Sequence, residues 1–201
     1  QWEGLLAMAE KALPFIEKTF GPYPYKQYSF IHGGDGGMEY PMATLIVGPG
    51  AAVHEWMHSW YQMMLGTNES LYPWMDEGFN TFIDIYAYGD YFRATPATDT
   101  LFAHNLAAYF TSATPGQEQP LINAPSEVRS LYFTAYQKPA LMMALLREEV
   151  LGPEAFDRAF REYTRRWAFR HPQPADFFRT MDNLTGRNLD WFWRGWVYTT
   201  A

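Results

Sequence analysis

The spacing of hydrophobic residues along the chain predicts a protein that is helical over most of its length. At the N-terminal end, Leu5, Ala9, Leu13 and Ile16 recur at intervals of three or four residues, which places them on one side of a helix. Residues 21–24, Gly-Pro-Tyr-Pro, are strong breakers and end this helix. We therefore expect one amphipathic helix over the first twenty residues.

Two short runs after this helix have the composition of strands. Residues 27–32 and 43–47 are rich in aromatic and β-branched side chains, and the glycine-rich segment 33–37 separates them. Residues 48–50, Gly-Pro-Gly, then break the chain again. This part of the sequence predicts a small β element.

From residue 51 onward the pattern is almost wholly helical. One example is the apolar stripe of Phe156, Phe160, Tyr163 and Trp167, which follow one another at helical spacing. The expected helices cover residues 52–65, 73–88, 98–111, 126–151, 153–169 and 175–184. A small β element followed by a helical bundle is an α+β arrangement that is mainly α.

The length and composition suit one domain with a substantial core. The chain has 201 residues, of which 48% are hydrophobic and 18% aromatic. We treat residues 1–201 as one domain, with the first helix and the β element in residues 1–50 and the helical part in residues 51–201. No stretch reaches the roughly 20 consecutive apolar residues that a membrane span needs, so none is expected in this chain.

Charge and cysteine content exclude several classes of partner and site. The formal net charge is −7, from 22 acidic and 15 basic residues. Binding to nucleic acid relies on clustered lysine and arginine, so no nucleic-acid partner is expected. The chain has no cysteine, which excludes disulfides and thiolate metal ligands.

Residues 54–58, His-Glu-Trp-Met-His, place two histidines four residues apart within an expected helix. Residues at this spacing stand one above the other on the same helix face, so the imidazoles of His54 and His58 can bind one metal ion. Glu55 lies beside that face, where its carboxylate can contact a water molecule at the metal without binding the metal itself. The same pattern also occurs in ordinary helices, so a second signal is needed.

Glu77 supplies the second signal. It follows His58 after 18 intervening residues and lies in the next expected helix. That interval is long enough to finish the first helix, turn, and return a carboxylate from an antiparallel helix. Two histidines and one glutamate, with a coordination position left for water, are an established ligand set for catalytic zinc. We therefore predict one zinc ion per chain, bound by His54, His58 and Glu77.

Asp84 is a candidate for a supporting role in this site. It lies seven residues after Glu77, on the same face of the second helix. There it can hydrogen-bond a zinc-bound histidine and fix the tautomer of its ring. Asn80, on the adjoining turn, can share that role, and an ordinary solvent-exposed acid is the alternative interpretation of Asp84.

With these motifs the chain resembles the catalytic domain of the gluzincin zinc aminopeptidases, of the aminopeptidase N or membrane alanyl aminopeptidase type. The family's zinc motif is H-E-x-x-H, 18 residues and then Glu, as in residues 54–77. Residues 36–41, Gly-Gly-Met-Glu-Tyr-Pro, are similar to its exopeptidase motif G-x-M-E-N. Residues 20–25 and 176–192 resemble the two ends of its catalytic region. The resemblance implies a thermolysin-like metallopeptidase fold and hydrolysis of the N-terminal peptide bond of peptides.

The resemblance also implies roles for two residues in catalysis. Glu55 would take a proton from the attacking water and pass it to the leaving amine. In the family, a tyrosine ahead of a Lys-Gly-Ala-like segment donates a hydrogen bond to the developing oxyanion. Tyr136, followed by Gln-Lys-Pro-Ala, is similar, with Pro139 in place of glycine. Tyr132, one turn earlier, is the competing candidate.

Substrate binding is implied for Gly37, Met38 and Glu39 of the exopeptidase motif. A free peptide N-terminus is at least partly cationic near neutral pH, so a fixed carboxylate beside the metal favours it. In the family this glutamate sits on an edge strand whose backbone also holds the substrate. Peptides with a free N-terminus are therefore the expected substrates. Tyr40 stands where the family usually has asparagine, which leaves the placement of the substrate backbone open.

Other functions stay open on the sequence alone. A thermolysin-like endopeptidase also combines H-E-x-x-H with a distant glutamate, although Gly-Gly-Met-Glu ahead of the zinc helix is not expected there. A noncatalytic peptide-binding domain that kept the fold is another alternative, but such a protein would be expected to lose Glu55 or a metal ligand. An epoxide hydrolase activity, present in one family member, has no specific support.

The resemblance further implies that the chain is part of a longer protein. Family members carry an all-β domain before this region, which helps to form the substrate cleft, so such a domain is an expected partner. The family members that look most similar are exported bacterial enzymes. This similarity implies an extracytoplasmic location, either periplasmic or secreted.

Overall fold

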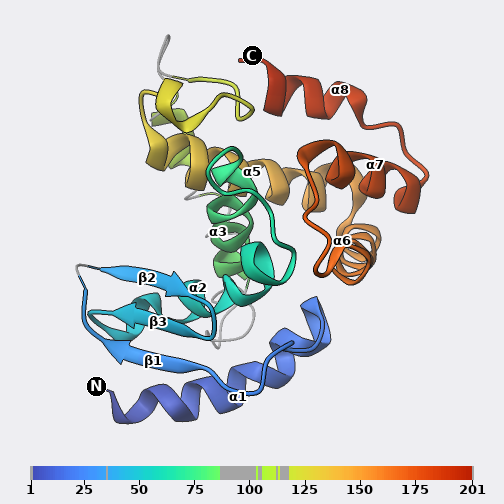
Figure 1. Ribbon diagram of the computed structural model, residues 1–201. Helices are drawn as coiled ribbons and strands as arrows, with labels where there is room; N and C mark the ends of the chain where they lie inside the picture. The colour runs from blue at the N-terminus through green and yellow to red at the C-terminus, as the bar shows by residue number, and fades with distance from the viewer. Residues whose placement is uncertain are drawn as a thin grey trace.

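The computed structural model describes residues 2–34, 36–86, 103, 106–111, 113 and 118–200. Within these residues a small sheet lies at one end of a larger group of helices (Figure 1). The predicted α+β class, mainly α, is confirmed. No helix in the described part of the chain is both long enough and apolar enough to cross a membrane.

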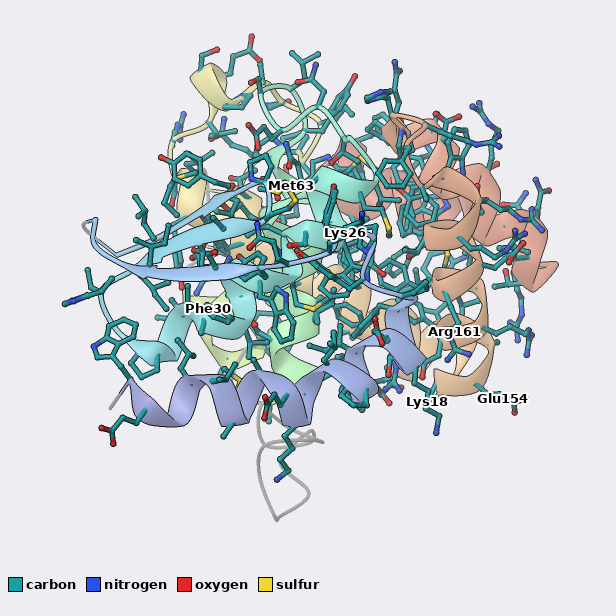
Figure 2. All side chains as sticks on the ribbon, turned by 60° about the horizontal axis from the view of Figure 1, so that its bottom comes forward. Lys18, Lys26, Phe30, Met63, Glu154 and Arg161 are labelled. Atoms are coloured by element: carbon teal, nitrogen blue, oxygen red, sulfur yellow. The ribbon has the colours of Figure 1, made fainter. Side chains whose placement is uncertain are left out.

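Helix α1 (Glu3–Phe20) runs along one side of the molecule and buries its predicted hydrophobic face. Leu5, Ile16 and Phe20 are among its buried side chains. The helix ends at Gly21, whose φ of 112° is strained for any residue with a side chain. Figure 2 shows Arg161 of the later helix α6 (Pro153–Trp167) near the C-terminal end of α1, where the Arg161 Nε donates a hydrogen bond to the Thr19 carbonyl at 3.0 Å.

In the described part of the chain the sheet has three strands, one more than the hydrophobic pattern predicts. Strand β3 (Ala43–Ile46) lies in the centre, parallel to β1 (Ser29–His32) and antiparallel to β2 (Gly37–Tyr40). Strand β2 follows directly from the glycine-rich segment, so its composition is not that of a typical strand. Its extended conformation depends on pairing with β3. On β3, Thr44 and Ile46 are buried, while β2 forms one edge of the sheet among the described residues.

The two helices that carry the predicted metal ligands are shorter than expected. Helix α2 (Ala52–Met57) gives way to a π-helical turn, Ser59–Met64, in which the backbone leaves the helical conformation. Helix α3 (Glu77–Tyr86) begins after a short 3-10 turn, Pro73–Met75. The last two residues of the expected helix 73–88, and half of the expected helix 98–111, lie outside the described residues. The described residues of the second segment, 103 and 106–111, are helical as expected.

The prediction of one helix over residues 126–151 is wrong at its start. Pro125–Glu127 form a 3-10 turn, and residues 128–130 are not helical. The segment becomes helical at a π-helical turn, Tyr132–Gln137, and continues as α5 (Lys138–Leu145) and a second π-helical turn, Leu146–Leu151. Later in the described chain come α6 (Pro153–Trp167), α7 (Pro174–Thr185) and the short α8 (Asp190–Trp193), which continues as a π-helical turn, Arg194–Tyr198.

Helices α3 and α5 meet at a glycine. A Cβ atom at Gly78 would lie 2.6 Å from the Cβ of Pro139, which is closer than packed atoms can approach. A side chain at residue 78 would therefore push the two helices apart. This contact holds the π-helical turn Tyr132–Gln137, which leads directly into α5, against the helix that begins with Glu77.

Candidate metal centre

The three side chains predicted as metal ligands converge on one point. The Nε2 atoms of His54 and His58 are 3.3 Å apart, and Glu77 Oε2 lies 3.1 Å and 3.5 Å from them. Donors about 2.0–2.1 Å from a tetrahedral zinc ion are separated by about 3.3 Å. The spacing of these donor atoms therefore fits a zinc ion with a further position left for water.

The fold explains how these residues meet. His54 is in the middle of α2, and His58 follows the last residue of that helix. Glu77 is the first residue of α3, so its side chain reaches the histidines from the start of a neighbouring helix. The Asn80 side-chain amide donates a hydrogen bond to the His54 carbonyl at 3.4 Å. Asn80 therefore supports the backbone of α2, not a histidine ring.

Each histidine has a carboxylate on the nitrogen that faces away from the ligand site. His54 Nδ1 lies 2.7 Å from Asp84 Oδ2, as expected for a supporting residue. His58 Nδ1 lies 2.6 Å from Asp76 Oδ1, and both of these residues are buried. Such a bond fixes the ring orientation and leaves Nε2 as the metal-binding atom.

Asp76 was missed by the sequence analysis. The available signal was its position directly before Glu77, at the start of the helix that carries the third ligand. Its side chain is 5% exposed, so it has lost nearly all contact with solvent. A buried carboxylate of this kind requires a charged or hydrogen-bonding partner, and His58 provides one.

The two histidines have raised pKa values. Burial by itself lowers the pKa of His54, but its bonds with Asp84 and Glu77 outweigh burial and raise the pKa to about 10. Burial is likewise outweighed at His58, where Asp76 and Glu77 hold the pKa well above its usual value. A metal ion binds the neutral imidazole, so metal binding displaces these protons and weakens as the pH falls.

Replacing Asp76 by asparagine is expected to weaken zinc binding by about 10- to 100-fold. The amide oxygen can still accept the hydrogen bond from His58, but it lacks the negative charge that makes the imidazole a stronger ligand. Competition with a chelator of known affinity measures the change. The control is Asp190→Asn, which removes an exposed carboxylate on α8. Equal affinities of Asp76→Asn and the unchanged protein would refute the role of the Asp76 charge.

Glu55 lies beside the ligand atoms, on a buried part of α2. Its side chain faces β2, since a Cβ atom at Gly37 would lie 2.6 Å from Glu55 Cδ. The Tyr28 hydroxyl donates a hydrogen bond to the Glu55 carbonyl at 2.9 Å, which ties α2 to the chain just before β1. Burial raises the pKa of Glu55 to about 7, against the opposing effect of the two histidines. A carboxylate with this pKa can take up and release a proton near neutral pH.

Glu39 projects from β2 toward the same site. Its carboxylate and the side-chain donor atoms of His58 and Asp76 all lie within 4.8 Å of one another. Burial raises the pKa of Glu39, and the charge of His58 opposes that effect. Next to it, Met38 has a 43% exposed side chain and accepts a hydrogen bond from the Thr44 hydroxyl with its carbonyl. The edge strand β2 thus brings Glu39 to the metal centre and Gly37 against Glu55, while no contact among the described residues joins the Met38 side chain to the metal ligands.

Of the two candidate tyrosines, Tyr136 lies beside the metal ligands. Its ring is stacked on that of His54, with centroids 6.3 Å apart and planes 14° from parallel. Burial and the nearby Glu77 carboxylate both raise the pKa of Tyr136, so its hydroxyl stays protonated. Tyr132 stacks on the ring of Tyr136, at 5.2 Å between centroids, and is 64% exposed. Tyr136 therefore offers a hydrogen-bond donor at the site, and Tyr132 lies one ring further out.

Comparisons with known sequences point to one family. A family model described as the peptidase family M1 domain matches residues 50–196. Leukotriene A-4 hydrolase of Xenopus laevis is 26% identical over 224 residues, which cover 96% of this chain and 36% of the relative. Aminopeptidase N of Plutella xylostella is 24% identical over 135 residues, which cover 65% of this chain and 14% of the relative. The chain thus spans well under half of either relative.

Solved structures share the fold of this chain. The M1 zinc metallopeptidase from Deinococcus radiodurans matches with a TM-score of 0.79 at 21% identity, over 99% of this chain and 45% of that one. Native yeast LTA4 hydrolase matches with a TM-score of 0.78 at 20% identity, over 96% of this chain and 35% of that one. At these identities the likeness concerns the fold.

Proposed function

The chain belongs to peptidase family M1, and we propose that it provides the catalytic centre of a zinc-dependent aminopeptidase. The family resemblance carried by the sequence motifs is thereby confirmed. The observation that carries the proposed activity is the Glu39 carboxylate, which lies within 4.8 Å of donor atoms of His58 and Asp76. A negative charge at this distance from the metal ligands favours a substrate whose N-terminal ammonium group lies next to the bond to be cut.

Zinc is the cofactor that the donor set supports. Two imidazoles and one carboxylate, with donor atoms 3.1–3.5 Å apart, are suited to a tetrahedral ion that keeps one position open. When bound there, zinc lowers the pKa of a water molecule and polarises the carbonyl group of the scissile bond. His54, His58 and Glu77 would hold it, and Asp84 and Asp76 would orient the two rings.

The protein's own residues account for the proton transfers. Glu55 takes a proton from the attacking water and delivers it to the nitrogen of the leaving peptide, for which a pKa near neutrality is suited. Tyr136 donates a hydrogen bond to the carbonyl oxygen as negative charge develops on it. Glu39 holds the substrate ammonium, so that the first peptide bond is placed between Glu55 and Tyr136.

One peptide in two forms tests this proposal. The zinc-loaded, full-length protein is incubated with the free peptide and with its N-acetylated form, and the products are followed by mass spectrometry. Stepwise loss of single residues from the free peptide alone is the expected result. Internal cleavage of both forms would show an endopeptidase and refute the role of Glu39. Absence of cleavage with zinc bound would favour the noncatalytic alternative.

Replacing Gly37 by alanine is expected to lower kcat by about 100-fold, with zinc content unchanged. The added methyl group would overlap the Glu55 carboxylate, and a displacement of about 1 Å in a reacting group can cost this much. Steady-state kinetics on a short peptide measures the effect. The matched control is Gly36→Ala, where a Cβ atom meets nothing within 4 Å. Equal kcat values of Gly37→Ala and Gly36→Ala would show that the placement of the Glu55 carboxylate does not depend on a missing side chain at residue 37.

The partner domain and the location are further parts of this proposal. An all-β domain that completes the cleft is implied by the family resemblance, as is an extracytoplasmic location. Limited proteolysis of the full-length protein tests the first, because a separate domain yields a stable fragment upstream of this region. Fractionation of the source cells tests the second, and recovery with cytoplasmic markers alone would refute it.

A further inference from the structure

A buried lysine lies next to the catalytic tyrosine and has no part in the chemistry described so far. Lys138, the first residue of α5, is 0% exposed and follows Tyr136 by two residues. Its Nζ forms an ion pair with Glu118 Oε1 at 2.8 Å and donates a hydrogen bond to the Gln119 carbonyl at 3.0 Å. A buried ammonium group is unfavourable unless it is paired, so these bonds hold residues 118–119 firmly against the start of α5.

The side chain of Gln119 binds the chain just before the π-helical turn that carries Tyr136. Its Nε2 donates a hydrogen bond to the Glu127 carbonyl at 2.9 Å, and its Oε1 accepts one from the Arg129 backbone amide at 2.5 Å. These two residues lie just before the π-helical turn Tyr132–Gln137. Gln119 is therefore bonded to the chain on both sides of the turn that carries Tyr136.

A third attachment reaches the middle of the turn. The Tyr109 hydroxyl donates a hydrogen bond to Glu118 Oε1 at 2.7 Å. The Tyr109 ring is stacked on Phe133, with centroids 5.6 Å apart and planes 25° from parallel. Phe133 belongs to the turn and is 4% exposed. The entry, middle and exit of the turn are thus all connected to residues 118–119.

We propose that Gln119 and Lys138 form a staple that positions the Tyr136 hydroxyl for transition-state stabilisation, a role that rests on the proposed aminopeptidase function. The Tyr136 ring is only half-buried, so packing alone does not determine where its hydroxyl lies. A donor to a developing oxyanion acts chiefly in the transition state, and its benefit depends on accurate placement. Loosening the staple therefore lowers kcat and leaves KM and zinc binding unchanged.

Gln119→Leu removes both hydrogen bonds that the Gln119 side chain makes, at a half-buried position. Its kcat is expected to fall about 10- to 100-fold on a short free peptide, with KM and zinc content unchanged. The matched control is Glu127→Gln, since the side chain of Glu127 is exposed and only its carbonyl takes part in the staple. Lys138→Met removes the bonds from Lys138 to Glu118 and to the Gln119 carbonyl, at the exit of the turn, and its kcat is expected to fall in the same way. A kcat of Gln119→Leu equal to that of the control would overturn the proposal.

A double-mutant cycle with Tyr136→Phe separates positioning from general damage to the fold. If the staple acts through the Tyr136 hydroxyl, Gln119→Leu causes no further loss of kcat once that hydroxyl is absent. A loss as large as that seen with Tyr136 present would refute the proposal while leaving the aminopeptidase assignment intact. Failure of the unchanged protein to cleave any free peptide would instead refute the proposed function.

Hydrogen exchange gives a readout that does not depend on activity. In zinc-loaded Gln119→Leu, the backbone amides of residues 132–137 are expected to exchange faster than in the unchanged protein, while those of α6 keep their rate. Unchanged exchange in residues 132–137 would mean that the staple does not hold the turn, whatever the kinetics show.

Discussion

Replacing Glu55 by glutamine is expected to lower kcat by about 100- to 10,000-fold while zinc stays bound. Glutamine has nearly the same shape and fits the same space beside Gly37, but it cannot take a proton from water. Glu55 is 7% exposed and burial raises its pKa to about 7, so its carboxylate is suited to take up a proton near neutral pH. Steady-state kinetics on a free peptide, with zinc content determined on the same sample, measures the effect.

A variant at an exposed glutamate shows whether the loss of kcat is specific to Glu55. The control is Glu154→Gln on α6, whose carboxylate is almost fully exposed and pairs with Arg158 one turn along the same helix. Its kcat is expected to equal that of the unchanged protein. If Glu55→Gln kept a kcat close to that of the control, a different group would be the base, and the assignment of Glu55 would fail.

Replacing His54 by alanine is expected to weaken zinc binding by more than about 100-fold, which exceeds the loss from a supporting residue such as Asp76. The variant removes one of three donor atoms and leaves Asp84 without its partner. Zinc content after dialysis, followed by chelator competition, measures the change. Full zinc content at unchanged affinity would exclude His54 as a ligand.

A stability measurement provides the control for this second result. A ligand that binds only the folded state raises the free energy of unfolding, so a chelator should lower the Tm of the unchanged protein. The same chelator should leave the Tm of His54→Ala nearly unchanged, because that variant binds little zinc. His32→Ala, at an exposed position on β1, should respond to the chelator as the unchanged protein does.

Much of the metal centre could be predicted because its ligands obey a local geometric rule. His54 and His58 are four residues apart, and the periodicity of a helix brings such side chains together whatever surrounds them. The helices α1, α6 and α7 were predicted for the same reason, since each is long enough to show a clear hydrophobic stripe. The roles of Glu39 and Tyr136 were predicted from family motifs, because the hydrophobic periodicity of the chain does not single out either residue.

The sequence pattern failed where a short segment depends on its neighbours. Strand β2 forms because it pairs with β3. The glycines before it leave no alternation of apolar and polar residues from which a strand could be predicted. The expected helix 126–151 starts six residues late, at Tyr132, because Gln119 binds the backbone of Glu127 and Arg129 in a non-helical conformation. Hydrogen bonds from distant residues here outweigh local helix propensity.

The sequence by itself determined the α+β class and the family, and it predicted the metal-ligand set, because each is visible in residue types at regular intervals along the chain. Only the tertiary structure decided that Asp76 binds His58, that Gly37 leaves room for Glu55, and that Gln119 holds the turn of Tyr136. These contacts join residues that are 8 to 18 positions apart in sequence. Their geometry depends on how the helices and strands pack, and no spacing along the chain encodes it.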